Sequence, residues 1–391
     1  MVGIAQKAGV RTVSFGCGLV VLALALGFGT PTAPAAQHGA SAGIADGGGQ
    51  AVASVVNGTA TSIGKWPWQV ALLGGRRPGT RATPLARFFC GGSLIAPDLV
   101  LTAAHCVANV KKSGFRNIQV VSGRTRLNRR STGTVSAIKR AIFPLNRNGK
   151  RRYRATDGVP SWDLALLQLK APLSSATIRI AGPDEAGATK PGRPTFTAGW
   201  GVTGPLKRKS SNRLRMARQV MLPNRICRST TGRFFDGTTM NCLGGPGAHS
   251  STCFGDSGGP LVTAVGDEFR LVGLTSNGDP YCRPYIPSVD TRIAAGPIRG
   301  WIHETALAIS GIDVIGRGGS VGPLPRWCRV PRLRNLTLPG ARRLLRSRSC
   351  RLGRTRPDRF SGLRRGRISF SGFLPGWFAP PNARITVWVA R

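Results

Sequence analysis

Three short stretches of the sequence carry side chains that could act together as nucleophile, base and orienting group. TCFGDSGGPL (252–261) places Ser257 among three glycines, directly after Asp256. LTAAHC (101–106) places His105 after an apolar run, and SWDLALLQL (161–169) places Asp163 at the head of another. A serine hydroxyl becomes a useful nucleophile only beside a base, and the base needs a group that orients it. A buried aspartate that accepts from an imidazole N–H would meet this need, because a buried carboxylate is costly without a hydrogen bond.

The glycines around Ser257 allow two interpretations. Glycine adopts backbone angles that other residues resist, and it lets main-chain N–H groups approach a partner closely. The loop could therefore direct amides at a developing negative charge. It could equally be a tight turn between two strands, so the elements around it must decide.

Those elements are predicted to be short strands. From residue 55 to about 309 the chain alternates apolar runs such as WQVALL, LALLQL and FRLVGLTS with turn residues and basic loops. This alternation is typical of an all-β sandwich or barrel. One late stretch, residues 298–309, has helical spacing instead.

The order His, Asp, Ser and the motifs TAAHC, DLALL and GDSGGP resemble the chymotrypsin/trypsin family of serine endopeptidases. TAGWG (197–201) and the WI pair at 301–302 match further landmarks of that family. The resemblance implies two six-stranded antiparallel β-barrels with a C-terminal helix over residues 55–309. It also implies that Ser257 attacks the scissile carbonyl, that His105 transfers the proton and that Asp163 orients His105. The backbone N–H groups of Gly255 and Ser257 would bind the oxyanion.

The cysteines point to export and to disulfides. Nine are present, and Cys17 lies in a predicted signal peptide over residues 1–35, which has a basic start, an apolar centre (19–28) and an Ala-x-Ala site before Ala36. An uncleaved membrane anchor is the alternative. The remaining even set favours disulfides in an exported protein. The resemblance implies the pairs Cys90–Cys106, Cys227–Cys242 and Cys253–Cys282. Cys328 and Cys350 are expected to staple the C-terminal unit, because so small a core is marginal alone.

The segment before the predicted barrels indicates a precursor. Residues 36–54 are rich in Gly and Ala and are expected to form a propeptide, and VVNG (55–58) resembles the family's mature N-terminus. In the family, the freed α-amine pairs with the aspartate before the nucleophile, here Val55 with Asp256. The family usually has Arg or Lys before this bond, whereas this chain has AVAS, so we expect an activating protease that accepts small residues.

Specificity is less clearly defined by the sequence. By resemblance the floor of the substrate pocket is Ser251, six residues before the nucleophile, and its walls are Gly278 and Ser288. Ser276, Asn277 and Gly278 would pair with the substrate backbone. A neutral floor favours an uncharged side chain before the cut. Asp290 stands where the family usually has Tyr near the pocket base; we expect it to face water or pair with an arginine, and the alternative is that it points into the pocket and favours basic residues.

The chain is strongly basic, with a formal net charge of +41, mostly from arginine. This charge indicates either an anionic partner or a general compositional bias. Residues 327–391 hold 16 arginines against one aspartate and have no lysine or glutamate. Their VPxLxxLTLxxARxxL run predicts a strand, a turn and a helix with Leu336, Ala341, Leu344 and Leu345 inward. This unit resembles the PASTA domain of bacterial wall-associated proteins, and residues 310–326 would be its linker.

The sequence therefore predicts a secreted, monomeric, precursor-activated serine endopeptidase that acts on proteins or peptides. Its tail would bind an anionic cell-wall polymer or peptidoglycan; a stabilising appendage without a ligand is the alternative. No metal, cofactor, nucleic acid or membrane span of the mature chain is expected, and the loop at 122–133 lacks the carboxylates of a calcium site. The rival is a catalytically silent homologue that works as a wall-binding or adhesion protein.

Overall fold

The structure is a computed structural model that describes residues 55–56, 58–75, 81–156, 158–204, 209–244, 250–319, 328–373, 375, 378–379 and 382–391. The predicted signal peptide and propeptide lie outside these residues. Within the described ranges, no helix has both the length and the apolar character needed to cross a membrane.

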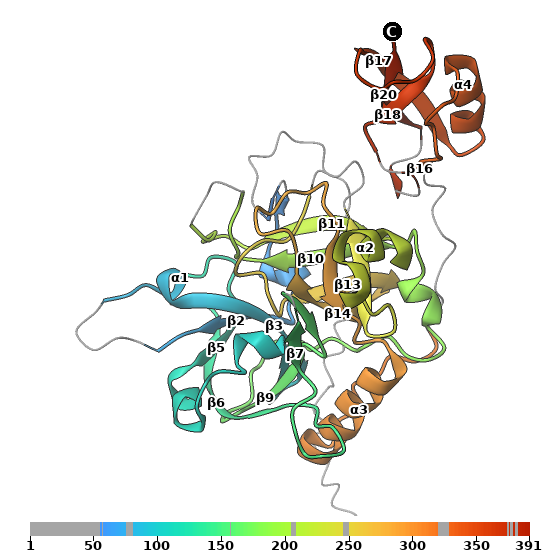
Figure 1. Cartoon of the computed structure of the whole chain (residues 1–391). Coiled ribbons are helices and arrows are strands. Elements are labelled where there is room, and N and C mark those ends of the chain that lie inside the picture. Colours follow the sequence, from blue (N-terminus) through green and yellow to red (C-terminus); the bar gives the residue numbers. More distant parts are fainter. Residues whose placement is uncertain are drawn as a thin grey trace, which may run out of the picture. The chain divides into compact units, whose positions relative to one another are not determined.

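Six antiparallel strands close the first barrel in the order β2-β3-β4-β9-β6-β5. Their bounds are β2 Gln69–Leu73, β3 Phe88–Ala96, β4 Leu99–Thr102, β5 Gln119–Ser122, β6 Thr134–Ile142 and β9 Ala165–Leu169. Figure 1 shows these strands in blue to green. Around them lie the helix α1 Pro84–Arg87, the hairpin of β7 Arg154–Thr156 and β8 Val159–Ser161, and the 3₁₀ turns η1 Ile63–Lys65, η2 Ala104–Cys106 and η3 Lys112–Asn117.

The second barrel runs β11-β10-β13-β14-β15-β12, and β12 pairs back on β11 to close it. Its strands are β10 Pro194–Gly199, β11 Arg215–Met221, β12 Met240–Gly244, β13 Pro260–Val265, β14 Glu268–Asn277 and β15 Ser288–Thr291. The short β1 Thr59–Ala60 adds to the edge of β11. The helix α2 Asn224–Thr231 and the 3₁₀ turns η4 Ala186–Thr189 and η5 Gly232–Phe234 complete this half. The predicted two-barrel architecture is thus confirmed.

The burial pattern explains why the strands of the first barrel read as continuous apolar runs. Val100 in β4 packs inside that barrel, whereas its neighbours Leu99 and Leu101 belong to the apolar cluster shared with Leu271 and Leu274 of β14. Both faces of such a strand are therefore buried, and strict apolar–polar alternation is lost. The shared cluster fixes the two barrels against each other and hence fixes the residues at their junction.

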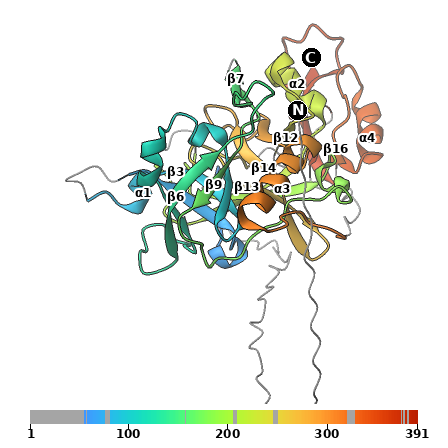
Figure 2. The ribbon, with the colours of Figure 1, turned by 90° about the horizontal axis from the view of Figure 1, so that it is seen from below.

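A helix and an ordered segment follow the last barrel strand. The helix α3, Gly296–Ser310, forms where helical spacing was predicted, and Figures 1 and 2 show it in orange. The chain beyond it was expected to be a linker from residue 310, but Val314 and Ile315 are buried there. The Ile180 N–H donates to the Val314 carbonyl at 2.9 Å, and the Gly316 N–H donates to the Ile180 carbonyl at 2.7 Å. The first part of the expected linker therefore packs on the second barrel.

The described residues of 328–391 contain one helix and five strands around an apolar cluster. These elements are β16 Cys328–Arg329, α4 Leu338–Arg346, β17 Cys350–Asp358, β18 Ile368–Ser371, β19 Phe378–Ala379 and β20 Ala383–Ala390. Ala341 and Leu345 of α4 are fully buried against the sheet β17-β20-β18. Leu336 and Leu344 are only partly buried.

All four expected disulfides are present. They join Cys90 to Cys106, Cys227 to Cys242, Cys253 to Cys282 and Cys328 to Cys350. The last of these staples the C-terminal unit, whose core is small for an independent fold.

Candidate active site

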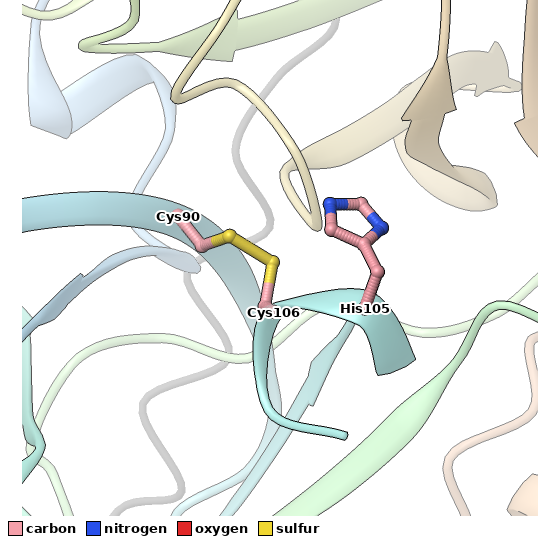
Figure 3. Close-up of side chains that lie close together, drawn as sticks. All are labelled: Cys90, His105 and Cys106. Atoms are coloured by element: carbon pink, nitrogen blue, oxygen red, sulfur yellow. A yellow bond between two sulfur atoms is a disulfide. The ribbon is translucent and has the colours of Figure 1, made fainter. Parts of the chain in front are cut away.

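His105 lies in the 3₁₀ turn η2, immediately after β4. The disulfide between Cys106 and Cys90 ties this turn to β3. Figure 3 shows His105 and Cys106 on the same turn and Cys90 on the neighbouring strand. Both sulfurs are used in the disulfide, so this Cys–His group is not a metal site even though its ligand atoms lie within 4.8 Å of one another. The turn fixes the backbone of His105 while its ring remains partly exposed.

Asp163 is fully buried just before β9 and is held by three donors. Its Oδ1 accepts from the His105 backbone N–H at 2.8 Å, and its Oδ2 lies 2.7 Å from His105 Nδ1. The Ser276 hydroxyl donates to the same Oδ2 at 2.6 Å. A carboxylate on Nδ1 requires that nitrogen to carry the proton, which leaves Nε2 free to accept one. His105 is therefore oriented as a base.

The loop of Ser257 is anchored on both barrels. The Gly91 N–H of β3 donates to the Ser257 carbonyl at 2.8 Å, and the Gly258 N–H donates to the Thr275 carbonyl of β14 at 2.8 Å. Cys106 Sγ lies 3.9 Å from the Ser257 carbonyl oxygen. These contacts bring Ser257 beside the turn that carries His105.

The glycines answer the question that the sequence raised. Gly258 has φ +74°, and a Cβ there would lie 2.2 Å from Thr102 Oγ1 and 2.7 Å from the Gly91 carbonyl oxygen. Gly255 has φ +93°, a region that favours glycine. Within the described part of the chain, no acceptor bonds the backbone N–H of Gly255 or of Ser257. Both N–H groups thus lack an acceptor among the described residues, as donors that stabilise an anion would.

Similarity to known proteins covers the residues that build this site. A family model described as Trypsin matches residues 55–302. The chain belongs to the trypsin family. It is 33% identical over 242 residues to a trypsin of Saccharopolyspora erythraea, a match that covers 62% of this chain and 94% of the relative. It is 31% identical over 258 residues to the transmembrane protease serine 5 of Homo sapiens, covering 64% of this chain and 51% of that protein. This trypsin-family chain is a serine endopeptidase.

Asp256, beside the nucleophile, is enclosed by glycines of the TAGWG motif. Its Oδ1 accepts from the Gly201 N–H at 2.9 Å and its Oδ2 from the Cys253 N–H at 3.0 Å. A Cβ at Gly199 or Gly201 would lie within 2.5 Å of Oδ1. Burial raises the pKa of Asp256 to about 7, because the two backbone hydrogen bonds only partly offset the loss of water. The two landmark glycines therefore make room for a carboxylate, a role that the sequence did not reveal.

Val55 and Val56 are buried close to the predicted pocket floor. Val56 pairs with Ser251 in an antiparallel bridge, in which the Ser251 N–H donates to the Val56 carbonyl at 3.1 Å. Ser251 itself is buried, and its hydroxyl donates to the Thr252 carbonyl at 3.0 Å. The start of the predicted mature chain and the pocket floor are thus neighbours.

The expectation that Asp290 faces water or pairs with an arginine is wrong. Asp290 lies in β15 and is 1% exposed. Among the described residues, neither of its side-chain oxygens has a hydrogen-bond partner.

Ser276 has a contact that the sequence analysis did not predict. It was assigned only to substrate pairing, yet its hydroxyl is the third donor to Asp163. The two residues are 113 positions apart, so no local pattern could have indicated the bond.

Proposed function

We propose that residues 55–319 are a secreted endopeptidase that uses Ser257 as nucleophile, His105 as general base and then acid, and Asp163 as the orienting group. The observation that carries this proposal is the hydrogen-bonded set of Asp163, His105 and Ser276 beside the anchored loop of Ser257. The four disulfides support export to an oxidising compartment.

The reaction follows from the positions of the protons. His105 Nε2 accepts the hydroxyl proton of Ser257 as Oγ bonds to the scissile carbonyl carbon, and the carbonyl oxygen takes the negative charge. The free N–H groups of Gly255 and Ser257 stabilise this oxyanion. The imidazolium, held by Asp163, then gives its proton to the leaving amine as the C–N bond breaks. Water repeats the sequence on the acyl-enzyme and restores the hydroxyl of Ser257.

We propose that cleavage before Val55 activates the enzyme. Asp256 is a buried carboxylate with two N–H donors but no ion-pair partner among the described residues. An α-amine freed at Val55, which is buried near this region, would supply the positive charge that favours the ionised form. Because no Lys or Arg occurs in residues 36–54, the activating protease would accept small residues.

Peptide-library turnover tests this function and its rival together. The protein processed to begin at Val55 is compared with the uncut precursor and with processed Ser257→Ala, and products are identified by mass spectrometry. We expect cuts from the processed protein, a rate at least about 100-fold lower from the precursor, the scale of a lost oxyanion donor, and no cuts from Ser257→Ala. No cuts by protein with a verified Val55 terminus would instead support the silent, wall-binding homologue.

We further propose that the C-terminal unit binds an anionic cell-wall polymer. A row of side chains crosses its three strands: Trp388 lies 5.2 Å from the Phe370 ring centroid and 5.6 Å from Arg356 Cζ. Phe370 is largely exposed, and Arg351 lies opposite Arg384 further along the same two strands, β17 and β20. Aromatic rings that stack on sugars beside guanidinium groups that pair with anions suit such a polymer.

Retention of the full chain on purified bacterial cell walls tests this role. We expect Trp388→Ala to weaken retention by about tenfold, in line with the loss of a stacked aromatic, and higher salt to weaken it further. Phe360→Ala is the matched control, because Phe360 is an almost fully exposed aromatic outside the strands. Equal retention of all three proteins would mean that the unit is an appendage without this ligand.

A further inference from the structure

A cavity of about 470 Å³ lies between η4, the start of α3 and the segment that joins β15 to α3. Two arginines and two threonines, Arg292, Arg299, Thr189 and Thr238, line it together with small alanine and proline side chains. None of the described residues that line it belongs to the triad or to the predicted substrate pocket. A cavity of this size, largely apolar and with a few polar groups, is typical of a site for a small molecule.

Both arginines of this cavity are held in place by backbone carbonyl groups. Arg292 Nη1 donates to the Gly237 carbonyl at 2.7 Å. Arg299 Nη1 donates to the Ala294 carbonyl at 2.8 Å and, at 3.5 Å, to the Ala181 carbonyl. A guanidinium has five N–H donors, and no described residue accepts from Nε or Nη2 of either arginine. Each side chain is therefore fixed while most of its donors stay available to a ligand.

The positive charge of the two arginines is not neutralised by an acid in the cavity. Glu185 is the one acidic residue among the described residues that line it, and both of its oxygens already accept from Arg270 Nε, at 3.0 and 3.1 Å. Neither Arg292 nor Arg299 takes part in a described ion pair. Burial lowers the pKa of both guanidinium groups, and at Arg299 it outweighs the nearby charge of Asp184. An anion in the cavity would compensate this loss of water.

A neighbouring cavity of about 490 Å³ shares Arg299 but has a different balance of charge. It is also lined by His303, Arg317 and Asp184. Arg317 Nη2 lies 2.7 Å from one oxygen of Asp313, and His303 Nδ1 lies 3.3 Å from the other. The basic groups there already have an acidic partner, and Asp184 adds a further carboxylate. Of the two cavities, the one that contains Arg292 is therefore the better suited to an anion.

We propose that the cavity of Arg292 and Arg299 binds a small organic anion whose phosphate or carboxylate group is held by the two guanidinium groups. Planar guanidinium groups bind both kinds of oxyanion through paired N–H donors. The Thr189 hydroxyl, which has no hydrogen-bond partner among the described residues, offers another donor. The alanine and proline side chains would contact the apolar body of the ligand. Because the triad lies outside the cavity, the proposal does not depend on peptidase activity.

Titration calorimetry on the full chain carrying Ser257→Ala measures binding without turnover. Phenyl phosphate, benzoate and phenol serve as probes, because they share one ring and differ in the group attached to it. We expect at least one of the two anions to bind, and phenol to bind at least about tenfold more weakly than that anion. The tighter of the two anions identifies the head group that the site prefers. Failure of both anions to bind, or equal binding by phenol, would overturn the proposal.

Substitutions of the two arginines locate the bound anion. Arg292→Gln and Arg299→Gln should each weaken binding of the preferred probe by about tenfold, the scale of a lost hydrogen bond to a charged group. Arg129→Gln is the control, because Arg129 is an exposed arginine in the loop between β5 and β6. It removes one positive charge outside the cavity and should leave the affinity unchanged. An equal effect of all three substitutions would show that the probe responds only to net charge.

A pair of substitutions at the edge of the cavity keeps the test valid if the arginine variants do not fold. Ala186 lines the cavity and is exposed, so a longer side chain can be accommodated there. Ala186→Glu places a carboxylate beside the arginines and should abolish binding of the probe. Ala186→Gln adds a side chain of the same length without the charge and should change the affinity by no more than about threefold. Equal affinities of these two variants would place the anion elsewhere and overturn the proposal.

Discussion

Two buried aspartates, Asp163 and Asp290, lie on either side of Ser276, and they differ in the hydrogen bonds that their carboxylates accept. Asp163 has three donors within 2.8 Å, among them the Ser276 hydroxyl and both the backbone and ring nitrogens of His105. Asp290 lies opposite Ser276 across the bulge, equally inaccessible to water, and has no hydrogen-bond partner among the described residues. A carboxylate with three donors holds its neighbours in one arrangement, whereas burial without such donors favours the neutral form of the acid. The comparison separates a residue that orients His105 from one that contributes no such hydrogen bonds.

The largest expected effect comes from replacing the carboxylate of Asp163 by an amide. Asp163→Asn should lower kcat by about 10⁴ on every peptide, because an amide cannot hold the His105 tautomer that makes Nε2 the base. Steady-state rates on several peptides that differ in the residue before the cut check it. The fall should be equal on all of them. A fall confined to one peptide would contradict an orienting role for Asp163.

A smaller effect concerns pH and the precursor. The pKa of Asp256 is raised to about 7 and that of Asp290 to about 8 by burial, whereas both are near 4 in the unfolded chain. The folded state therefore keeps protons that the unfolded state releases. Stability contributed by the neutral forms is complete below about pH 4 and is lost as the pH rises through 7 to 8. The loss is about 4 kcal/mol for Asp256 and about 6 kcal/mol for Asp290.

Denaturant unfolding of the uncut Ser257→Ala precursor between pH 4 and 9 measures this loss. The reference is the same protein with Asp256→Asn and Asp290→Asn added, which cannot ionise at either site. We expect the parent to lose stability relative to the reference as the pH rises. Parallel curves would show that both carboxylates are already compensated in the folded precursor.

Much of this could be predicted from the sequence because the relevant signals are local. TAAHC and GDSGGP each fix a nucleophile or base within a few residues, and the apolar runs follow the strands. The disulfides followed from the resemblance that those motifs established. The helix at 298–309 was visible from its spacing, and α3 occupies Gly296–Ser310.

The parts that the sequence missed depend on contacts between distant strands. Nothing near Asp290 in the sequence shows that a bulge in β14 faces it, or that no described arginine forms an ion pair with it. The donation from Ser276 to Asp163 likewise joins two separate strands. The glycines of GIDVIGRGG (311–319) favour a linker. Gly316 is instead required by packing, because a Cβ at this position would lie 2.1 Å from Arg270 Nε.

That ordered segment bears on how the enzyme is made. Val314 and Gly316 bond to Ile180, so a residue in the middle of the chain waits for partners about 135 positions later. During synthesis, the strands of both barrels and α3 leave the ribosome before Val314 and Gly316 do. The hydrogen bonds that hold Ile180 therefore form only after all barrel strands have been made.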